Sequence, residues 1–392
     1  MNIFLSGPGL VFAGGKSSEE LFEAVVAADN SGIKKVRVDG GQEFFAATVN
    51  KDDFEAVTAG GGEFDSKLIR IENAALNQIK AVTQAAVNKY GAERVGACVG
   101  SCDNLTELSS PAHKKFFEAG DFGDYSIEKQ SAQYVAKFVK EKFSLGGPCT
   151  TFSTACSSSA VAIIKAAQLI KAGICDAVIA GGVDIASDTA LMGFGSLEAV
   201  SPQPTNPFSK NRQGITIGEA AAFFLLSRED LDNSGIILAG YGESADAYHI
   251  TSPDPSGEGA AAAMEKALKN AGLSPADIGY LNLHGTGTKF NDSMEAKALS
   301  KVFGDYKVPC SSTKGTTGHS LGAAAALELA ICFETLKSSD RLPAQHWDGE
   351  RDEEMPELNF VCRGAKAGKI NCCLSNSFAF GGANASLIIK KI

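Results

Sequence analysis

Several features that define large classes of proteins are missing from this sequence. Its ten cysteines are scattered and none forms a CxxC pair, which argues against a structural zinc site or a disulfide framework. No apolar run approaches the roughly 20 residues that a membrane-spanning helix needs. The opening residues, MNIFLSGPGLVFAGG, lack the positive charge that begins a secretory signal. We therefore expect a reduced, soluble and cytoplasmic protein with no membrane partner.

Basic residues are also too few for a protein that binds nucleic acids broadly. The chain carries 36 Lys and Arg against 46 Asp and Glu, and its net charge is −10. Anionic partners are therefore repelled over most of the surface. The glycine-rich segments never complete the GxxxxGK(S/T) spacing of a phosphate-binding loop. We expect no nucleic-acid partner, and an acidic protein partner would need a local basic patch.

The sequence does contain enough apolar residues for a large core. With 392 residues, 44% hydrophobic and 21% charged, the chain exceeds the usual size of one domain. In the first half a strand and glycine turn precede a helical pattern over residues 66–90 and a strand over residues 94–100. The charged residues 337–357, with two prolines, are typical of a solvated connection.

The same order of elements restarts near Ser234. SGIILAGYGESAD indicates a strand and a glycine turn, residues 259–271 an Ala-rich helix, and IGYLNLHG another strand. This repetition predicts an α/β protein with two similar halves, residues 1–232 and residues 233–392.

One cysteine lies in a context that favours chemistry. Cys156, in TACSSSA, follows the strand-like TTFS and precedes the helical pattern AVAIIKAAQLIKAG. Backbone N–H groups at a helix start stabilise a thiolate, and later the oxyanion formed when a thioester is attacked. The alternative is the ordinary role of a free cysteine as a small buried hydrophobic residue.

Two histidines lie where a regular element gives way to a loop. His284, in HGTGT, ends the apolar run YLNL, and His319, in KGTTGHSLG, precedes the Ala-rich AAAALELAICFETLK. Each could instead be structural, His284 within its loop and His319 within a capping or glycine turn. A cysteine with two such histidines supplies a nucleophile and two hydrogen-bonding groups without a metal or organic cofactor.

Four motifs, TACSSSA, HGTGT, KGTTGHSLGAA and SNSFAFGGAN, resemble in this order the motifs of fatty-acid and polyketide ketosynthases. LSGPGLVFAGG, ITIGEAAAFFLL and SADAYHITSPDPSG resemble family segments as well, so the similarity covers nearly the whole chain. The sequence is thus similar to the β-ketoacyl-acyl-carrier-protein synthases of the thiolase superfamily. The resemblance implies the thiolase fold, with two similar α/β halves stacked as α-β-α-β-α layers. It also implies a dimer through the strand before the nucleophile, here residues 150–153.

The resemblance further implies an acyltransferase reaction in two stages. Cys156 would take an acyl chain from an acyl carrier protein as a thioester. His284 and His319 would then promote loss of CO2 from malonyl-carrier protein, and the resulting carbanion would attack acyl-Cys156. Backbone N–H groups of Cys156 and Phe380 would hold the oxyanion. The product would be a β-ketoacyl-carrier protein in fatty-acid, polyene or polyketide synthesis.

Further residues match family positions with defined roles. The charged positions that pair and orient the histidines are Lys314 and Glu328. The gates of the acyl pocket are Phe378 and Phe380, and the hydroxyls that touch the pantetheine or malonyl group are those of Thr286 and Thr288. The alternatives for these residues are solvated charges and local turn caps.

Two larger sets also match. Some relatives hold a structural monovalent cation at the positions of Asn282, Glu328, Ser375 and Asn376. An acidic carrier protein would dock on a basic rim formed by Lys67, Arg70, Lys210 and Arg212. A buried hydrogen-bond network explains the first set equally well, and ordinary solubility explains the second.

The sequence leaves the partner subunit and the pathway open. TACSSS is also the form common in polyketide ketosynthases, some of which pair with a chain-length factor that lacks the active cysteine. The chain would thus form a homodimer, or a heterodimer with such a subunit. A second enzyme class with the same fold, the CoA-dependent thiolases, is an alternative. A thiolase normally uses a second cysteine as base in place of one histidine, so His319 in GHSLGA argues against it. A silent partner subunit would have no need of Cys156, His284 and His319 together.

Overall fold

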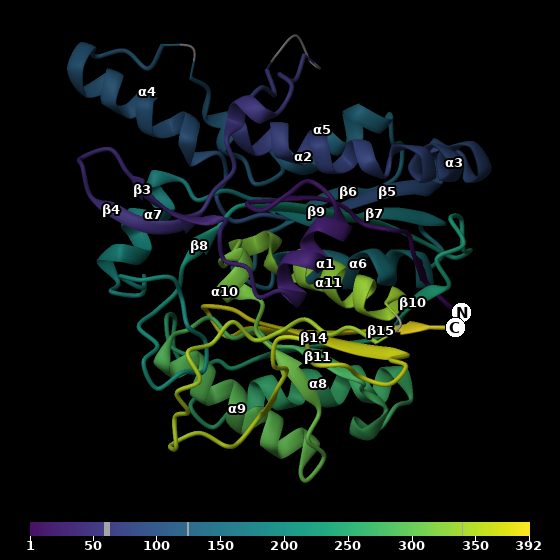
Figure 1. Cartoon of the computed structure of the whole chain (residues 1–392). Helices are drawn as coiled ribbons and strands as arrows, with labels where there is room; N and C mark the ends of the chain where they lie inside the picture. Colours follow the sequence, from purple (N-terminus) through teal and green to yellow (C-terminus); the bar gives the residue numbers. More distant parts are fainter. Residues whose placement is uncertain (59–62, 124, 339) are drawn as a thin grey trace.

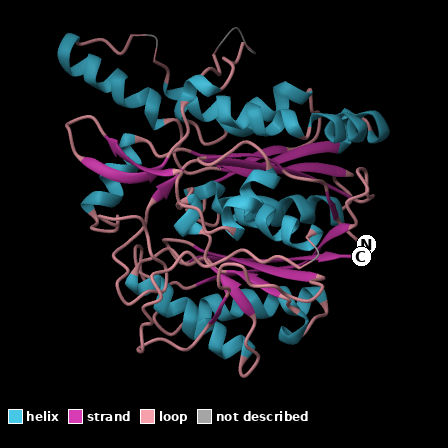
Figure 2. Ribbon diagram, viewed as in Figure 1, coloured by secondary structure: helices cyan, strands magenta, loops and turns pink. Residues whose placement is uncertain are grey.

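The computed structural model describes residues 1–58, 63–123, 125–338 and 340–392. In these residues helices and sheets alternate in five stacked layers, with a helical layer in the middle and one on each outer side (Figure 1). Figure 2 shows the two sheets in magenta, separated by the central helices in cyan.

The first sheet belongs to the N-terminal half of the chain. Its strands, in spatial order, are β2 (Gly9–Phe12), β9 (Ala220–Ser227), β7 (Ala177–Asp184), β5 (Val95–Gly100) and β6 (Cys149–Phe152). The helices over its outer face are α2 (Lys67–Gln78), α3 (Lys80–Tyr90) and α5 (Tyr134–Phe143) (Figure 1). Strands β7 and β9 are buried along their whole length, as expected for strands between two helical layers.

The second sheet belongs to the C-terminal half. Its strands, in spatial order, are β10 (Ile236–Ala245), β15 (Ala383–Lys391), β14 (Cys372–Phe378), β11 (Tyr280–Asn282), β12 (Pro309–Ser311) and β13 (Asn359–Phe360). The helices over its outer face are α8 (Glu258–Ala271) and α9 (Lys289–Phe303) (Figure 1). The short β1 (Phe4–Leu5) pairs with both β9 and β10, so hydrogen bonding continues from one sheet into the other.

Both sheets have the same topology. Numbered in chain order within each half, their five main strands have the spatial order 1-5-4-2-3. Pairs 1-5 and 5-4 are antiparallel, and pairs 4-2 and 2-3 are parallel, in both sheets. This repetition confirms the prediction of two similar α/β halves in α-β-α-β-α layers. One apolar core takes residues from both halves, and the expected boundary at residues 232 and 233 falls between β9 and β10.

The middle layer contains two largely buried helices, α6 (Ser158–Lys171) and α11 (Ala324–Lys337), with α1 (Ser18–Val26) and the short α10 (Lys314–Thr317) beside them (Figure 1). Residues 324–336 of α11 are all buried. A helix that is buried around its whole circumference belongs between two layers and not on a surface. The small alanine side chains of α11 let both sheets pack closely against it. The loops at the ends of these helices therefore lie at the centre of the molecule.

A smaller sheet lies at one side of the layers. It consists of β3 (Ile33–Arg37), β4 (Glu43–Ala47) and β8 (Ile217–Gly218), and its apolar side chains pack with those of α7 (Asp188–Ser196). Helix α4 (Thr106–Ala119) projects from the outer layer (Figure 1). Among the described residues, no helix combines the length and the apolar character that crossing a bilayer requires.

Two expectations about single elements need correction. The helical pattern over residues 66–90 forms two helices, because the backbone of Ile79 (φ −97°, ψ 9°) separates α2 from α3. Residues 337–357 contain little regular structure, and Ser339 lies outside the described residues, but Leu342 and Gln345 are buried. The Gln345 amide donates to the carbonyl of Pro207 at 3.0 Å. This connection therefore belongs in part to the core and is not simply solvated.

Candidate active site

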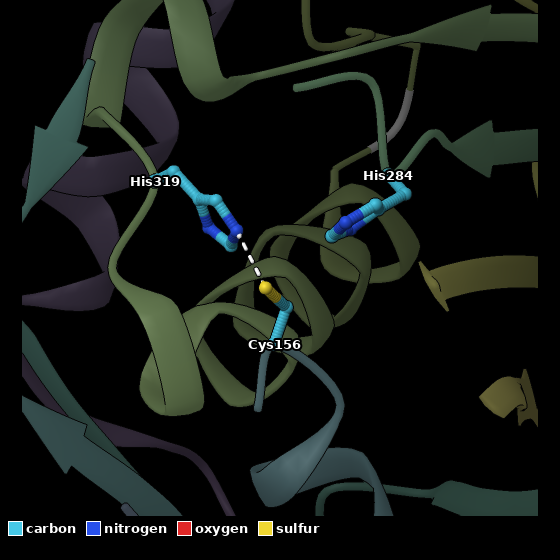
Figure 3. Close-up of side chains that lie close together, drawn as sticks. All are labelled: Cys156, His284 and His319. Carbon is cyan, nitrogen blue, oxygen red and sulfur yellow. Dashed lines mark hydrogen bonds between the residues drawn. The ribbon is translucent and has the colours of Figure 1, made fainter. Parts of the chain in front are cut away.

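Cys156 lies in the turn between β6 and α6, at the start of the helix where the sequence placed it (Figure 3). Ala155 has a left-handed backbone (φ 51°), which makes the turn sharp. The Ser158 hydroxyl closes this turn: it accepts a hydrogen bond from Thr154 N–H at 2.9 Å and donates one to Ala155 O at 2.6 Å. The thiol is thus presented at the amino end of α6.

His319 places its ring against this thiol. Its Nε2 lies 3.0 Å from the sulfur of Cys156 (Figure 3). Its backbone N–H donates to Thr216 O at 2.7 Å, and its carbonyl accepts from Gly218 N–H at 2.8 Å. Main-chain contacts with the first half therefore fix a histidine that the second half supplies.

His284 follows β11 and faces the same point from another direction (Figure 3). The ring centroids of His284 and His319 are 5.4 Å apart, edge to face. One ligand atom each from Cys156, His284 and His319 lies within 4.8 Å of the other two. The structure thus brings together the three motifs that the sequence singled out. Sulfur and imidazole donors at this spacing would also suit a soft metal ion.

The loop that carries His284 is held by two carboxylates that the sequence reasoning missed. Glu295 accepts hydrogen bonds from the N–H groups of His284 and Gly285 at 2.9 and 2.8 Å. Asp292 accepts two more, from the next two residues, at 3.0 and 3.2 Å. Both belong to the first turns of α9 and are buried. The available signal was the acidic pair in NDSMEA, at a helix start directly after HGTGT.

Lys314 and Glu328 form a buried ion pair beside His284. The Lys314 ammonium also donates to the carbonyl of His284 at 2.5 Å and lies 3.5 Å from its Nδ1. An ammonium group can only donate hydrogen bonds, so Nδ1 must accept and the ring proton of neutral His284 must be on Nε2. Lys314 therefore fixes the tautomer in which Nε2–H is a donor.

His319 is not fixed in this way. Its Nδ1 is buried and has no hydrogen-bond partner in the described part of the chain. Neither neutral tautomer is selected by that nitrogen. Nε2 can therefore accept a proton in one step and donate a hydrogen bond in another.

Burial favours the neutral form of all three groups. Burial lowers the pKa of His284 and of His319 well below the ordinary value, and the charge of Lys314 lowers both further. Burial raises the pKa of the Cys156 thiol to about 11, although the N–H of Phe380 and the charge of Lys314 act in the opposite direction. The N–H groups at the helix start do lower the thiol pKa, as expected, but burial raises it by more. The resting pair is a thiol hydrogen-bonded to a neutral imidazole.

Backbone donors converge on the sulfur. The N–H groups of Phe380 and Cys156 lie near the thiol and lower its pKa, so they favour its ionised form. Phe380 follows β14, and Gly381 and Gly382, with φ of 85° and 77°, turn the chain back into β15. Two N–H groups beside a nucleophile form a site where the oxyanion of a tetrahedral intermediate can be held.

These groups line a cavity of about 510 Å³. Phe378 is buried with its ring centroid 6.0 Å from that of His284, and Phe380 is half-buried in the cavity wall. Thr286 and Thr288 also line the cavity, with their hydroxyl oxygens 3.0 Å apart. The contacts of these four residues with a substrate stay predictions.

The residues considered for a monovalent cation do not all face one point. Ser375 and Asn376 are neighbours in β14, so their side chains lie on opposite faces of the sheet. Asn376 faces the outer layer, where its amide lies 3.3 Å from Glu295 of α9. Asn282 Oδ1 and Glu328 Oε2 are each buried without a hydrogen-bond partner among the described residues. These two oxygens fit a cation site, whereas Asn376 does not fit the same site as Ser375.

The four basic residues expected to form a docking rim already have acidic partners. The pairs and their N–O distances are Lys67 with Glu219 at 2.7 Å, Arg70 with Asp65 at 2.7 Å, Lys210 with Glu350 at 2.6 Å and Arg212 with Asp352 at 2.5 Å. Of the four, Arg212 alone lines the cavity, and it is buried. The expected rim is therefore not present as a set of free surface cations around the cavity.

Comparisons with known proteins cover the whole chain. Residues 2–231 match the family Beta-ketoacyl synthase, N-terminal domain, and residues 236–347 match Beta-ketoacyl synthase, C-terminal domain. The 3-oxoacyl-acyl-carrier-protein synthase 2 of Coxiella burnetii is 32% identical, over 100% of this chain and 98% of that protein. Nodulation protein E of Rhizobium meliloti is 35% identical, over 80% of each chain.

Solved structures agree with these relatives. The ketosynthase ApeO from Xenorhabdus doucetiae, determined in complex with its chain length factor ApeC, has a TM-score of 0.92 and 37% identity, over 100% of this chain and 98% of that one. A β-ketoacyl synthase from Burkholderia phymatum has a TM-score of 0.84 and 28% identity, over 100% and 99%. The expected thiolase fold is thus confirmed, and this chain belongs to the β-ketoacyl synthase family.

Proposed function

We propose that this protein condenses an acyl group bound to Cys156 with a malonyl group carried by an acyl carrier protein. The observation that carries the proposal is the 3.0 Å contact between Cys156 Sγ and His319 Nε2, with His284 facing the same cavity. The reaction releases CO2 and yields a β-ketoacyl-carrier protein two carbons longer. Such a product serves fatty-acid, polyene or polyketide synthesis.

In the first stage Cys156 takes the acyl group. His319 Nε2 accepts the thiol proton while the sulfur attacks the thioester carbonyl. The oxyanion is held by the N–H groups of Phe380 and Cys156. When the intermediate collapses, the bond to the carrier's sulfur breaks, and that sulfur leaves with the proton from His319.

In the second stage both histidines act on the malonyl thioester. His284 donates from Nε2 to the thioester oxygen, and His319, whose proton is free to lie on Nε2, donates to the same oxygen. The carbon–carbon bond to the carboxylate breaks and CO2 leaves. The electron pair of that bond becomes part of an enolate. The enolate carbon attacks the acyl-Cys156 carbonyl, the carbon–sulfur bond breaks, and the thiolate takes up a proton from water.

A partner subunit is the alternative that a specific observation favours. A ketosynthase 37% identical to this chain was determined with its chain length factor. Strand β6 is the last strand of its sheet and is incompletely buried, so it offers an edge for pairing. We therefore infer a dimer, formed with a second copy or with a subunit of that kind.

The reaction is proposed to take place in the cytoplasm without an organic cofactor. All ten cysteines lie in the described ranges and are free, as expected in a reducing compartment. Asn282 and Glu328 are the residues we propose for a structural monovalent cation. The cation would balance the buried charge of Glu328 and take no part in the steps above.

The function is tested by mass spectrometry of the intact protein, incubated first with an acyl-carrier protein and then with malonyl-carrier protein. We expect an acyl adduct on Cys156 that malonyl-carrier protein discharges as a β-ketoacyl product. Cys362→Ala, which removes an exposed thiol, is the matched control and should be acylated normally. An adduct that forms only after addition of a chain length factor would indicate the heterodimer. No adduct under either condition would exclude the proposal.

The variant Cys156→Ala separates the two stages. The histidines and backbone donors remain, so it should still release CO2 from malonyl-carrier protein. Condensation should fall by about 1,000-fold or more, because the acyl group can no longer form a thioester with residue 156. Labelled CO2 and labelled product are measured in the same reaction. Full condensation by this variant would show that Cys156 is not the nucleophile.

A further inference from the structure

Three exposed apolar side chains lie at or beside the mouth of the cavity, among exposed polar ones. Leu197, just after α7, is 55% exposed, and Phe290, in the first turn of α9, is 72% exposed, and both line the cavity. Ile250 is 76% exposed, and its carbonyl accepts a hydrogen bond from Gly381 N–H at 2.8 Å, next to the oxyanion residue Phe380. We call Leu197, Ile250 and Phe290 the mouth patch.

Three separate loops supply the mouth patch. Leu197 and Ile250 follow α7 and β10, Phe290 lies where the loop after β11 enters α9, and none of the three belongs to a core cluster. Single exposed apolar residues are ordinary, but a group of them beside the entrance to an active site favours a surface that another molecule covers.

Charge at the mouth does not favour an acidic partner. The charged residues that line the cavity are Glu198, Arg212, Asp246 and Lys289. Two of these are acidic, and Arg212 is buried in its ion pair with Asp352. Among the described residues that line the cavity, Lys289 alone is an exposed cation, directly beside Phe290. An acidic carrier therefore gains little from charge at this surface, and apolar contacts must supply most of the affinity.

The geometry of delivery selects the occupant. A carrier protein holds its acyl group on a prosthetic arm, and the thioester has to reach Cys156 through the cavity beside whose mouth these residues lie. The body of the carrier then lies over the entrance, and the surface that meets it is the mouth patch.

We propose that the mouth patch, with Lys289 at its side, is the docking surface for the acyl carrier protein, in place of the basic rim that the sequence suggested. The proposal rests on the proposed function, because it assumes that substrates arrive on a carrier. The patch acts on docking alone: it changes how tightly the carrier binds and not the chemistry at Cys156.

The test compares one acyl group presented on the carrier protein with the same group on pantetheine alone. Ile250→Ser should raise the KM for carrier-bound substrate by about tenfold and leave the constants for the pantetheine thioester within about twofold. Phe290→Ser should act in the same direction on the carrier. The matched control is Ile127→Ser, since Ile127 is equally exposed (72%) but lies between α4 and α5 and does not line the cavity.

Salt gives a second readout. The KM of the unchanged protein for the carrier should vary by less than about threefold between about 50 and 300 mM NaCl, whereas a basic rim would make it rise steeply.

The proposal is overturned if Ile250→Ser and Phe290→Ser leave the carrier KM unchanged, or if Ile250→Ser, which does not line the cavity, raises both KM values equally. It is also overturned if they change the oligomeric state by light scattering, because the patch would then be covered by a subunit. Failure of the unchanged protein to condense either form of substrate, with and without a chain length factor, would instead refute the proposed function.

Discussion

His284 and His319 occupy the same cavity, yet their surroundings give the two rings different chemistry. The ammonium of Lys314 holds the proton of His284 on Nε2, so this ring is a fixed donor. Nothing among the described residues binds Nδ1 of His319, so its proton can lie on either nitrogen. The ring that touches the sulfur is thus the one that can first accept a proton and later donate.

The protonation of Cys156 can be followed through its alkylation. Because burial raises the thiol pKa to about 11 and lowers the pKa of His319, little thiolate exists near neutral pH. The thiolate fraction then grows with each pH unit below that value. We expect the rate of inactivation by iodoacetamide to rise continuously between about pH 6 and pH 9. A rate that is constant above about pH 7 would instead indicate a thiolate–imidazolium pair.

The pair of Lys314 and Glu328 should serve both stability and chemistry. Lys314→Met leaves Glu328 buried without a counter-charge, which should lower the free energy of unfolding by about 3 kcal/mol. Burial raises the pKa of Glu328 to about 7 even beside Lys314, and its pKa rises further without it. A raised pKa in the folded state stabilises the protein at low pH, so the loss in this variant should grow as pH increases.

The double variant Lys314→Met/Glu328→Gln distinguishes the two roles. It should regain most of the stability, because no charge is left buried, but not the decarboxylation of malonyl-carrier protein, because His284 is no longer fixed. Urea unfolding and CO2 release are the two measurements. Recovery of both properties would show that the pair only stabilises the fold.

At the scale of elements, the position of the amino end of α6 depends on Gly100, the last residue of β5, which has no side chain. A Cβ on Gly100 of β5 would lie 2.3 Å from the backbone nitrogen of Ser159, so one of the two elements would have to move. Gly100→Ala should lower the free energy of unfolding by about 1–3 kcal/mol and slow acylation of Cys156.

The control for this substitution is Gly193 in α7. Gly193→Ala meets no atom within 4 Å, so it should be neutral or raise stability by up to about 1 kcal/mol. Urea unfolding and the rate of acyl-adduct formation compare the two variants. Equal behaviour would contradict the argument that close approach of β5 positions the nucleophile.

Strands and helices could be predicted from the sequence where local patterns determine them. Contacts between side chains that are distant in the sequence could not. Strands followed by glycine turns and one Ala-rich helix pattern were enough to expect two similar halves. The partners of the basic residues were hidden because they are distant in sequence: Lys67 and Glu219 are 152 residues apart. The neutral state of Cys156 depends on burial by the finished fold, which no local pattern reveals. The opposite faces of Ser375 and Asn376, by contrast, follow from strand alternation alone.

At the scale of the whole molecule, the repeated topology explains why the site is at the centre. Cys156 lies between the third strand and the central helix of the first half, and His319 lies at the equivalent place in the second half. His284 follows the second strand of its half, and the corresponding loop of the first half contains Cys102, whose thiol donates to Ala155 O at 3.1 Å. The duplication therefore brings equivalent loops together around one sulfur.

The edge of the molecule at β6 should control how it assembles. The Gln133 amide donates to Cys149 O at 2.6 Å and accepts from Thr151 N–H at 3.1 Å, so it takes the place of a neighbouring strand. A second subunit that pairs with β6 must displace these two hydrogen bonds. Their net contribution is about 1 kcal/mol each.

Gln133→Ala should therefore strengthen dimerisation, lowering the dissociation constant about thirtyfold, because about 2 kcal/mol is no longer needed to break these bonds. The measurement is sedimentation equilibrium over a range of protein concentrations. Gln84→Ala, which removes an exposed glutamine of α3 that bonds to Asn88, should leave the constant unchanged. If Gln133→Ala has no more effect than this control, the subunits meet elsewhere and β6 stays an edge capped by its own chain. A lower constant would instead show that the strand leading to Cys156 is shared across the dimer, so that the partner subunit supports the nucleophile directly.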